Sequence, residues 1–319
     1  MFIALAAVMI MGTLVAANLG EGDAAWRTGA YSIFIGLCGG AFVLGALALG
    51  NVPALGGGTR AVIGFSLETV TAAAAPLCLV RGVRLRVARL LHSFSPESSL
   101  HAVSLGLYFL FFTFQVSQQV AVDQLKSFAS TGGQASSTNL AYLLGTSSAP
   151  MFAIAIVGVG LFSRRSLRET AARLGLTWPR WRWLLASLGV VVVLLVLDVG
   201  FGALMQTLTP QQNKALSEVT KNLFGSINTL PQVIALGIGA GVGEELLFRG
   251  ALLPRFGNLL TALLFAAAHV QYAVSIATLE IFVLGLVLGW LRRRAGTTGC
   301  IVAHAGYDIA IGMLTLVPK

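Results

Sequence analysis

Charge is scarce in this 319-residue chain: only 10% of its residues are Asp, Glu, Lys or Arg, against about 25% in soluble domains. At the same time 56% of the residues are hydrophobic, and the mean hydropathy is +0.84. Because a soluble domain needs a polar surface, this composition excludes a water-soluble enzyme, a disordered protein and a collagen-like fibre. The sequence therefore predicts an all-α fold, a polytopic membrane helical bundle.

Paired cysteines and a contiguous basic surface are also missing. Cys38, Cys78 and Cys300 lie singly in or beside apolar runs, which predicts small core residues and neither disulfides nor a cysteine metal site. The net charge of +9 comes from Lys and Arg in short gaps between apolar runs. Nucleic-acid binding needs basic residues gathered on one face. We therefore expect the lipid bilayer, and no nucleic acid, as a partner.

Apolar runs long enough to cross a bilayer predict about ten transmembrane helices. They cover approximately residues 2–20, 30–50, 61–80, 102–122, 140–163, 183–207, 231–256, 258–272, 274–291 and 298–316. The first run has no basic segment before it and is followed by further spans, so we expect an uncleaved anchor. The more polar stretches 123–139 and 208–229 are predicted to be outer loops.

Most basic residues fall in alternate connections, at positions 81–89, 164–182, 255 and 292–294. The positive-inside rule predicts that these connections are cytoplasmic and that both termini lie outside. We expect an integral, multi-pass protein of a bacterial inner membrane. Segments 81–92 and 165–174 also space their arginines as helices on anionic lipid would, although ordinary cytoplasmic loops are the favoured interpretation.

Ionisable side chains are concentrated in the four C-terminal spans. Half of the 12 acidic residues lie within apolar runs, where each costs at least about 2.5 kcal/mol without a partner or a function. The C-terminal spans contain Glu244, Glu245, Arg249, His269, Glu280, His304 and Asp308. Glycines at alternate positions from 237 to 243 predict close helix packing just before this group. The chain is therefore divided into N-terminal helices of unknown role, 1–230, and a catalytic core, 231–319.

Helical geometry predicts that several of these side chains share one depth. If the chain turns at Gly257–Asn258, Glu244 and His269 both lie about 18 Å from the cytoplasmic end, at a rise of ~1.5 Å per residue. By the same rise His304 and Asp308 lie about 9 and 15 Å inside. One buried cavity that opens toward the cytoplasm can hold all four side chains.

The two adjacent glutamates are predicted to have different roles. Glu245 and Arg249 are four residues apart on one helical face, which predicts an ion pair that fixes the helix. Glu244 points ~100° away and is the predicted general base that activates water. His304 and Asp308 are also four apart, so that the carboxylate is expected to hold the imidazole tautomer.

Two mechanisms are compatible with this residue set. His269 adds a second imidazole, and two imidazoles can stabilise the oxyanion formed when water attacks a peptide carbonyl. Equally, a divalent metal such as zinc can bind four of the side chains. Its ligands would be Glu244, His269, His304 and Asp308. A non-hydrolytic protein, either a proton-coupled transporter or an immunity factor, is the alternative. The crowding of charged groups at one end favours the enzyme.

Three motifs in the C-terminal region carry a resemblance to a known family. Residues 244–249 read EExxxR, residues 265–269 read FxxxH, and residues 304–308 read HxxxD. In this order, over about 231–316, they resemble the CPBP family of intramembrane proteases. That family contains the CAAX proteases, among them the type II CAAX prenyl endopeptidases, and bacteriocin-processing enzymes.

The resemblance implies a membrane endopeptidase that acts on a peptide or protein substrate, which is lipidated in some members. It implies that Glu244 activates water and that His269 and His304 stabilise the transition state or bind a metal. Asp308 stands where family members carry Asn or Asp. The resemblance leaves the cofactor open between none and one divalent metal.

Overall fold

The computed structural model describes residues 2–53, 58–121, 140–177 and 180–316. Most described residues are helical and none of them forms a β-strand, which confirms the predicted all-α fold. The chain packs as two compact units, described separately below. Unit 1 comprises 1–123 and 157–170, and unit 2 comprises 124–156 and 171–319. The predicted boundary at residue 230 separates the N-terminal helices from the region of the candidate site residues, and it stays a prediction.

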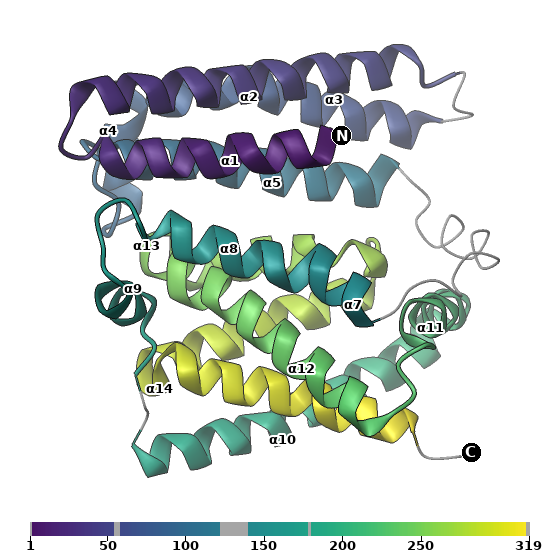
Figure 1. Cartoon of the computed structure of the whole chain (residues 1–319). Helices are drawn as coiled ribbons and strands as arrows, with labels where there is room; N and C mark the ends of the chain where they lie inside the picture. Colours follow the sequence, from purple (N-terminus) through teal and green to yellow (C-terminus); the bar gives the residue numbers. More distant parts are fainter. Residues whose placement is uncertain (1, 54–57, 122–139, 178–179, 317–319) are drawn as a thin grey trace. The chain divides into compact units, whose positions relative to one another are not determined.

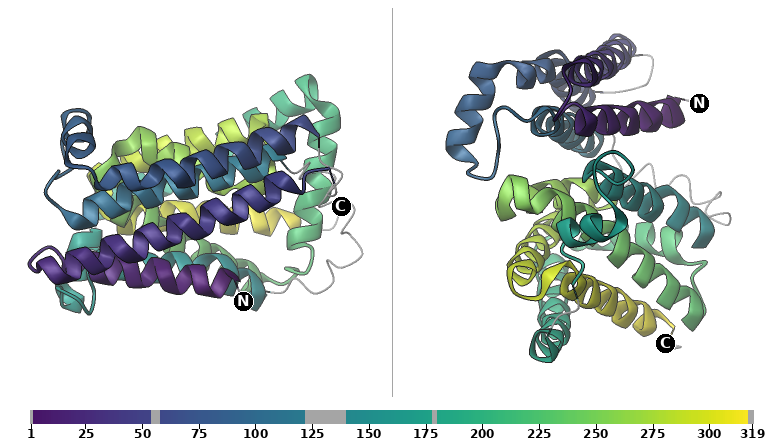
Figure 2. Two further views of the ribbon diagram at one scale, coloured as in Figure 1. Left: turned by 90° about the horizontal axis from the view of Figure 1, so that it is seen from above. Right: turned by 60° about the vertical axis from the view of Figure 1, so that its left-hand side comes forward.

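Unit 1 is a bundle in which α1, α2, α3 and α5 lie side by side (Figures 1 and 2). Asp23 starts α2, because its Oδ1 accepts hydrogen bonds from the backbone N–H groups of Ala25 and Trp26. The helical segments of this unit are α1 (Phe2–Leu19), α2 (Ala24–Gly50), α3 (Thr59–Ala74), η1 (Ala75–Leu79), α4 (Arg81–Leu90) and α5 (Ser99–Ala121).

Unit 2 is built around the kinked helix α14, which packs against both α10 and α12. A capping box of Thr229 and Gln232, with Pro231 in the first turn, starts α12. The helical segments are α7 (Leu140–Leu143), η3 (Leu144–Ser148), α8 (Ala149–Gly158), α9 (Leu167–Leu174), α10 (Trp181–Leu208), α11 (Pro210–Phe224), α12 (Leu230–Glu245), η4 (Leu246–Leu252), α13 (Leu253–Ala268), η5 (Val270–Tyr272) and α14 (Ile276–Thr315). Residues 157–170, at the end of α8 and the start of α9, pack with unit 1.

Each predicted span overlaps one or more helical segments. Within the described residues, six helical stretches are long and apolar enough to cross a membrane, and residues 6–19 form a shorter apolar helix. The stretch Leu230–Ala268 contains two predicted spans, as does α14. Both merged helices break at a glycine with positive φ: Gly257 (φ 75°) and Gly296 (φ 72°). Glycine adopts this conformation without a steric penalty, so the chain turns there and the predicted turn at Gly257 is confirmed.

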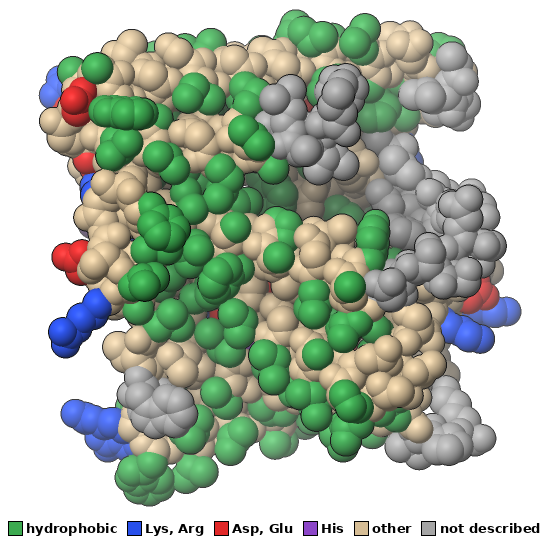
Figure 3. All heavy atoms as spheres, in the orientation of Figure 1, with side chains coloured by type: hydrophobic (Ala, Val, Ile, Leu, Met, Phe, Trp, Pro, Cys, Tyr) green, Lys and Arg blue, Asp and Glu red, His purple; other side chains and the backbone are tan. Residues whose placement is uncertain are grey.

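Exposed apolar side chains identify the flanks of the helices as surfaces that need lipid. On α10, Val192, Val196 and Val199 are 60%, 65% and 71% exposed, which water would disfavour. Hydrophobic side chains cover much of the face drawn in Figure 3, whereas Lys and Arg gather near helix ends. With the apolar length of the helices, this makes the chain an integral multi-pass membrane protein.

Three connecting segments differ from the predicted loops. The stretch 208–229 contains α11, which starts at Pro210 and buries Leu216 and Val219 on one face. Segments 81–92 and 165–174 contain α4 and α9, so both are helical, and their contact with anionic lipid stays a prediction. No residue of α4 is buried. The predicted loop 123–139 lies outside the described residues.

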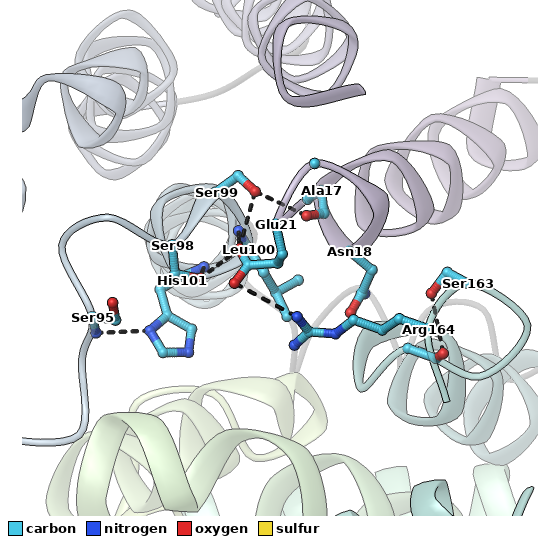
Figure 4. Close-up of polar contacts among 12 residues, drawn as sticks. Ala17, Asn18, Glu21, Ser95, Ser98, Ser99, Leu100, His101, Ser163 and Arg164 are labelled. Atoms are coloured by element: carbon cyan, nitrogen blue, oxygen red, sulfur yellow. Dashed lines mark hydrogen bonds and ion pairs between the residues drawn. The ribbon is translucent and has the colours of Figure 1, made fainter. Parts of the chain in front are cut away.

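A polar cluster at one end of unit 1 joins α1, α5 and the 157–170 segment (Figure 4). Glu21 Oε1 accepts hydrogen bonds from the Ser98 and Ser99 hydroxyls at 2.8 and 3.0 Å and from the Leu100 N–H at 3.1 Å. Its Oε2 lies 3.6 Å from Arg164 Nη1. Burial raises the pKa of Glu21, but these hydrogen bonds and Arg164 outweigh burial, so its net pKa is below the ordinary value of 4.5.

We expect Glu21→Gln to destabilise unit 1 by about 1–2 kcal/mol at neutral pH, because charged hydrogen bonds are lost. A pKa lowered by folding means that the stabilisation is complete above pH 4.5 and disappears as pH falls through the folded-state value. Unfolding in detergent at a series of pH values measures this difference. Glu97→Gln is the control, since its ion pair with Arg81 is 66% exposed and should contribute little. An equal loss from both substitutions would contradict the prediction.

Candidate active site

Glycines allow α12 to approach two neighbours closely. A Cβ atom built on Gly241 would lie 3.0 Å from the backbone nitrogen of Ala305 in α14. On another face, a Cβ atom on Gly243 would lie 2.6 Å from the carbonyl oxygen of Ser148 in η3. Any larger residue would push these helices apart, as the sequence predicted. The glycines therefore set how closely the two glutamates that follow approach α14.

The predicted ion pair between Glu245 and Arg249 is present and fully enclosed. Arg249 Nη1 lies 2.7 Å from Glu245 Oε1, and the two side chains are 1% and 0% exposed. Arg249 Nη2 also donates to the Gly285 carbonyl at 3.3 Å, and its guanidinium carbon lies 4.2 Å from the centre of the Phe265 ring. Hydrogen bonds and a ring face thus offset part of the cost of burying these charges. Glu245 Oε2 and Arg249 Nε are buried and have no hydrogen-bond partner among the described residues.

The residues after Glu245 form a π-helix, η4 (Leu246–Leu252), where the sequence pattern predicted a regular α-helix. Its hydrogen bonds close over five residues, as in the bond from the Leu253 N–H to the Phe248 carbonyl. This wider turn begins inside the EExxxR motif and ends three residues beyond it. Single π-helical turns are rare in proteins as a whole, but many of those that occur lie at functional sites. No residue pattern in the motif predicts one.

His304 contacts Glu245, which the sequence did not predict. His304 Nδ1 lies 2.7 Å from Glu245 Oε1, while its Nε2 lies 3.6 Å from Asp308 Oδ2. A carboxylate only accepts, so Nδ1 carries the hydrogen and Glu245 fixes the ring. Asp308 lies beside the ring as its spacing predicted, at an ion-pair distance, and its role in holding the tautomer stays a prediction. The shorter contact to the ring comes from Glu245 on another helix.

Glu244 and His269 lie level with each other, from different helices. The distance from His269 Nε2 to Glu244 Oε2 is 3.9 Å. His269 Nδ1 lies 2.7 Å from the Phe265 carbonyl oxygen, so this nitrogen is the donor and Nε2 presents its lone pair. The gap between Glu244 and His269 is too long for a hydrogen bond but within reach of one bridging water. Glu244 Oε2 has no hydrogen-bond partner among the described residues.

A cavity of about 80 Å³ borders both histidines. This space holds several waters, since one water needs roughly 10–15 Å³ by the same type of measure. Its polar lining comprises His269, Tyr272, His304, Tyr307 and Asp308, and the remaining lining is apolar: Leu194, Phe265, Ile281, Leu284 and Leu288. The cavity thus combines a few convergent polar groups with an apolar wall, as binding sites do.

The predicted metal-ligand set does not gather around one point. Glu244 is near His269 and Asp308 is near His304, but among the described residues no three His, Cys, Asp or Glu side chains are grouped to hold an ion. These residues, as arranged, do not fit a zinc centre with three protein ligands.

The sequence did not predict a role for two tyrosines and two acidic residues near the cavity. The Tyr307 hydroxyl donates to Asp198 Oδ1 at 3.1 Å, and Glu280 lies near Asp198. The Tyr272 ring stacks on His269, with 6.1 Å between ring centres. Tyr307 lies inside the HxxxD motif, and this position was the one sequence feature that could have identified it. The acids come from helices whose pairing no spacing rule gives.

Comparison with known proteins identifies the region that contains this site. Residues 226–310 match the family described as Rce1-like type II CAAX prenyl endopeptidases, so the resemblance is confirmed over this segment. An uncharacterized 24.3 kDa protein of Escherichia coli is 35% identical over 124 residues, which cover 36% of this chain and 54% of that protein. The chain therefore spans about half the length of this relative. No solved structure matches the chain.

Proposed function

We propose that this chain is an intramembrane endopeptidase that hydrolyses a peptide bond with water bound between Glu244 and His269. The observation that carries the proposal is the 3.9 Å separation of Glu244 Oε2 and His269 Nε2, beside a cavity large enough for water. The match of residues 226–310 to a family of membrane endopeptidases supports it. A transporter needs a pathway with alternating access, which is commonly built from two related halves. The sequence shows no such repeats, so it does not favour a transporter.

In the proposed reaction Glu244 takes a proton from the bound water, whose oxygen attacks the peptide carbonyl carbon. His269 Nε2 accepts the second hydrogen of the water and so orients it. His304, when doubly protonated, donates Nδ1–H to Glu245 and Nε2–H to the oxyanion. The carbon–nitrogen bond then breaks, and the proton held by Glu244 passes to the leaving amine.

Each remaining motif residue acts through a neighbour in this scheme. Glu245 holds the His304 ring, and Arg249 holds Glu245. Asp308, 3.6 Å from His304 Nε2, favours the protonated imidazole. No step passes through a metal, because the side chains are not grouped around one ion.

The substrate class is a peptide or membrane-anchored protein whose scissile bond enters the apolar cavity in extended form. The arginines in the connections at 81–89, 164–182 and 292–294 support an active site that opens to the cytoplasm. The location that we propose is a bacterial inner membrane, and the one thing that the relative from Escherichia coli adds is a bacterial source.

The test is cleavage by the purified full-length chain in liposomes. Peptides of one sequence, with and without an isoprenoid on a C-terminal cysteine, would be incubated with the protein and analysed by mass spectrometry. New fragments that differ by one water are the expected result. Fragments from the prenylated peptide alone would assign a lipidated substrate. No cleavage of any peptide, together with proton-coupled uptake, would overturn the proposal in favour of a transporter.

Chelation should leave the rate unchanged. Treatment with 1,10-phenanthroline, followed by removal of the chelator, is expected to alter kcat by less than about twofold, since the site offers no three-ligand group. The measurement is the cleavage rate before and after treatment, with a zinc protease as the positive control. Loss of activity that zinc restores would replace the water-and-carboxylate mechanism by a metal-dependent one.

A further inference from the structure

The π-helix η4 is followed by Pro254, which removes a backbone donor just where the helix needs one. In π-helical geometry the Arg249 carbonyl would accept from residue 254, and in α-helical geometry the Gly250 carbonyl would do so. Proline has no N–H group, so these carbonyls need another source of hydrogen bonds. Arg249 and Gly250 are both buried.

Two arginines from outside the motif donate to this turn. Arg292 Nε donates to the Arg249 carbonyl at 3.2 Å. Arg173 Nη1 donates to the Gly250 carbonyl at 3.1 Å, and its Nη2 donates to the Ala251 carbonyl at 3.5 Å. The guanidinium group is suited to this task, because it offers several donors in a fixed plane.

The backbone around Arg292 is closely packed and admits few alternative positions. Arg292 Nη2 also donates to the Leu174 carbonyl at 3.5 Å, and a Cβ atom on Gly175 would overlap this guanidinium. The Thr297 N–H donates to the Gly175 carbonyl at 3.0 Å, directly after the break at Gly296. The end of α9, the break in α14 and η4 therefore meet around one side chain.

A continuous chain of contacts leads from this junction to the proposed chemistry. Arg292 binds the backbone of Arg249, and the side chain of Arg249 binds Glu245 at 2.7 Å. Glu245 in turn binds His304 Nδ1 at 2.7 Å. A shift of the π-helical turn would move these groups together, and misplacement by about 1 Å can cost about 100-fold in rate.

We propose that Arg292 and Arg173 are positioning residues, which hold the π-helical turn after Glu245 by hydrogen-bonding the carbonyls that Pro254 leaves without donors. This inference rests on the proposed function for its effect on rate. It extends the site beyond residues 226–310, because Arg173 lies outside the segment that matches the family.

The experiment compares Arg292→Gln and Arg173→Gln with Arg293→Gln in the full-length chain. Arg293 is the exposed neighbour of Arg292 and lies outside the contacts described above. Two readouts are taken: kcat and KM for peptide cleavage, and hydrogen–deuterium exchange of the amides in 246–253. Exchange needs no substrate, so it tests the positioning role even where the proposed function fails.

We expect Arg292→Gln to lower kcat by about 10- to 100-fold with KM changed less than about twofold, and to speed amide exchange in 246–253. Arg173→Gln should act in the same direction, Arg292→Lys should recover part of kcat, and Arg293→Gln should match the wild type. Wild-type kcat and exchange in Arg292→Gln would overturn the inference and leave the proposed function intact. If Arg292→Gln does not fold, Arg173→Gln and Arg292→Lys decide by the same two readouts.

Discussion

Replacement of Glu244 by Gln is expected to lower kcat for peptide cleavage by at least about 100-fold, and by up to about 10⁴-fold. The amide has the size of the carboxylate but cannot take a proton from water. Because Glu244 Oε2 has no hydrogen-bond partner among the described residues, the substitution breaks no internal contact of that oxygen. Stability should therefore change little while the rate falls. Quenched-peptide cleavage and detergent unfolding, on the same preparation, measure both quantities.

Glu218→Gln is the matched control for this experiment. Glu218 is exposed on α11, outside the motifs, and its replacement should leave kcat unchanged. An active Glu244→Gln variant would remove Glu244 as the general base and with it the proposed mechanism. Equal losses in both variants would indicate a defect in preparation instead of chemistry.

Replacement of Arg249 by Met is expected to destabilise the protein by about 3–5 kcal/mol, because Glu245 is left charged and enclosed with His304 as its one remaining partner among the described residues. The substitution keeps an unbranched apolar stem beside Phe265 but removes every donor. Reversible unfolding by titration with a denaturing detergent measures the change. Cleavage should also be lost, since Glu245 holds His304.

A double-mutant cycle separates the pair from its surroundings. Adding Glu245→Gln to Arg249→Met removes the unpaired charge, so the double variant should be more stable than Arg249→Met alone. The exposed pair Arg81 and Glu97 provides the comparison, with an expected coupling energy of about 1 kcal/mol or less. A coupling energy for Glu245 and Arg249 as small as that of the exposed pair would show that burial contributes nothing to their interaction.

Local sequence patterns, namely the length of apolar runs and helical spacing, were sufficient to predict most of the helices and one ion pair. Long apolar runs predicted the positions of the helices, since the hydrocarbon core of a bilayer fixes their length. The spacing of Glu245 and Arg249 predicted their ion pair, because residues four apart on a helix are neighbours. The equal depth of Glu244 and His269 followed from the turn at Gly257 and a constant rise per residue.

Contacts between distant segments were beyond that reasoning. The bond between Glu245 and His304 depends on how closely α12 and α14 approach, which their glycines indicate without giving the register. The π-helix is a departure from regular geometry that no spacing rule predicts. The hydrogen bond between Tyr307 and Asp198 joins residues 109 positions apart. The sequence identifies the reactive side chains, but it does not predict which of them are in contact.

Helix α10 contributes side chains to the site on the kinked helix α14, so the segment that carries the motifs is not a self-contained module. Leu194 of α10 forms part of the cavity wall, and Asp198 of the same helix binds Tyr307. A polypeptide cut to 226–310 would keep all three motifs yet lose that wall and the guanidinium of Arg173. Grafting the motifs into another bundle would therefore transfer the reactive groups without the helices that enclose and shape their cavity.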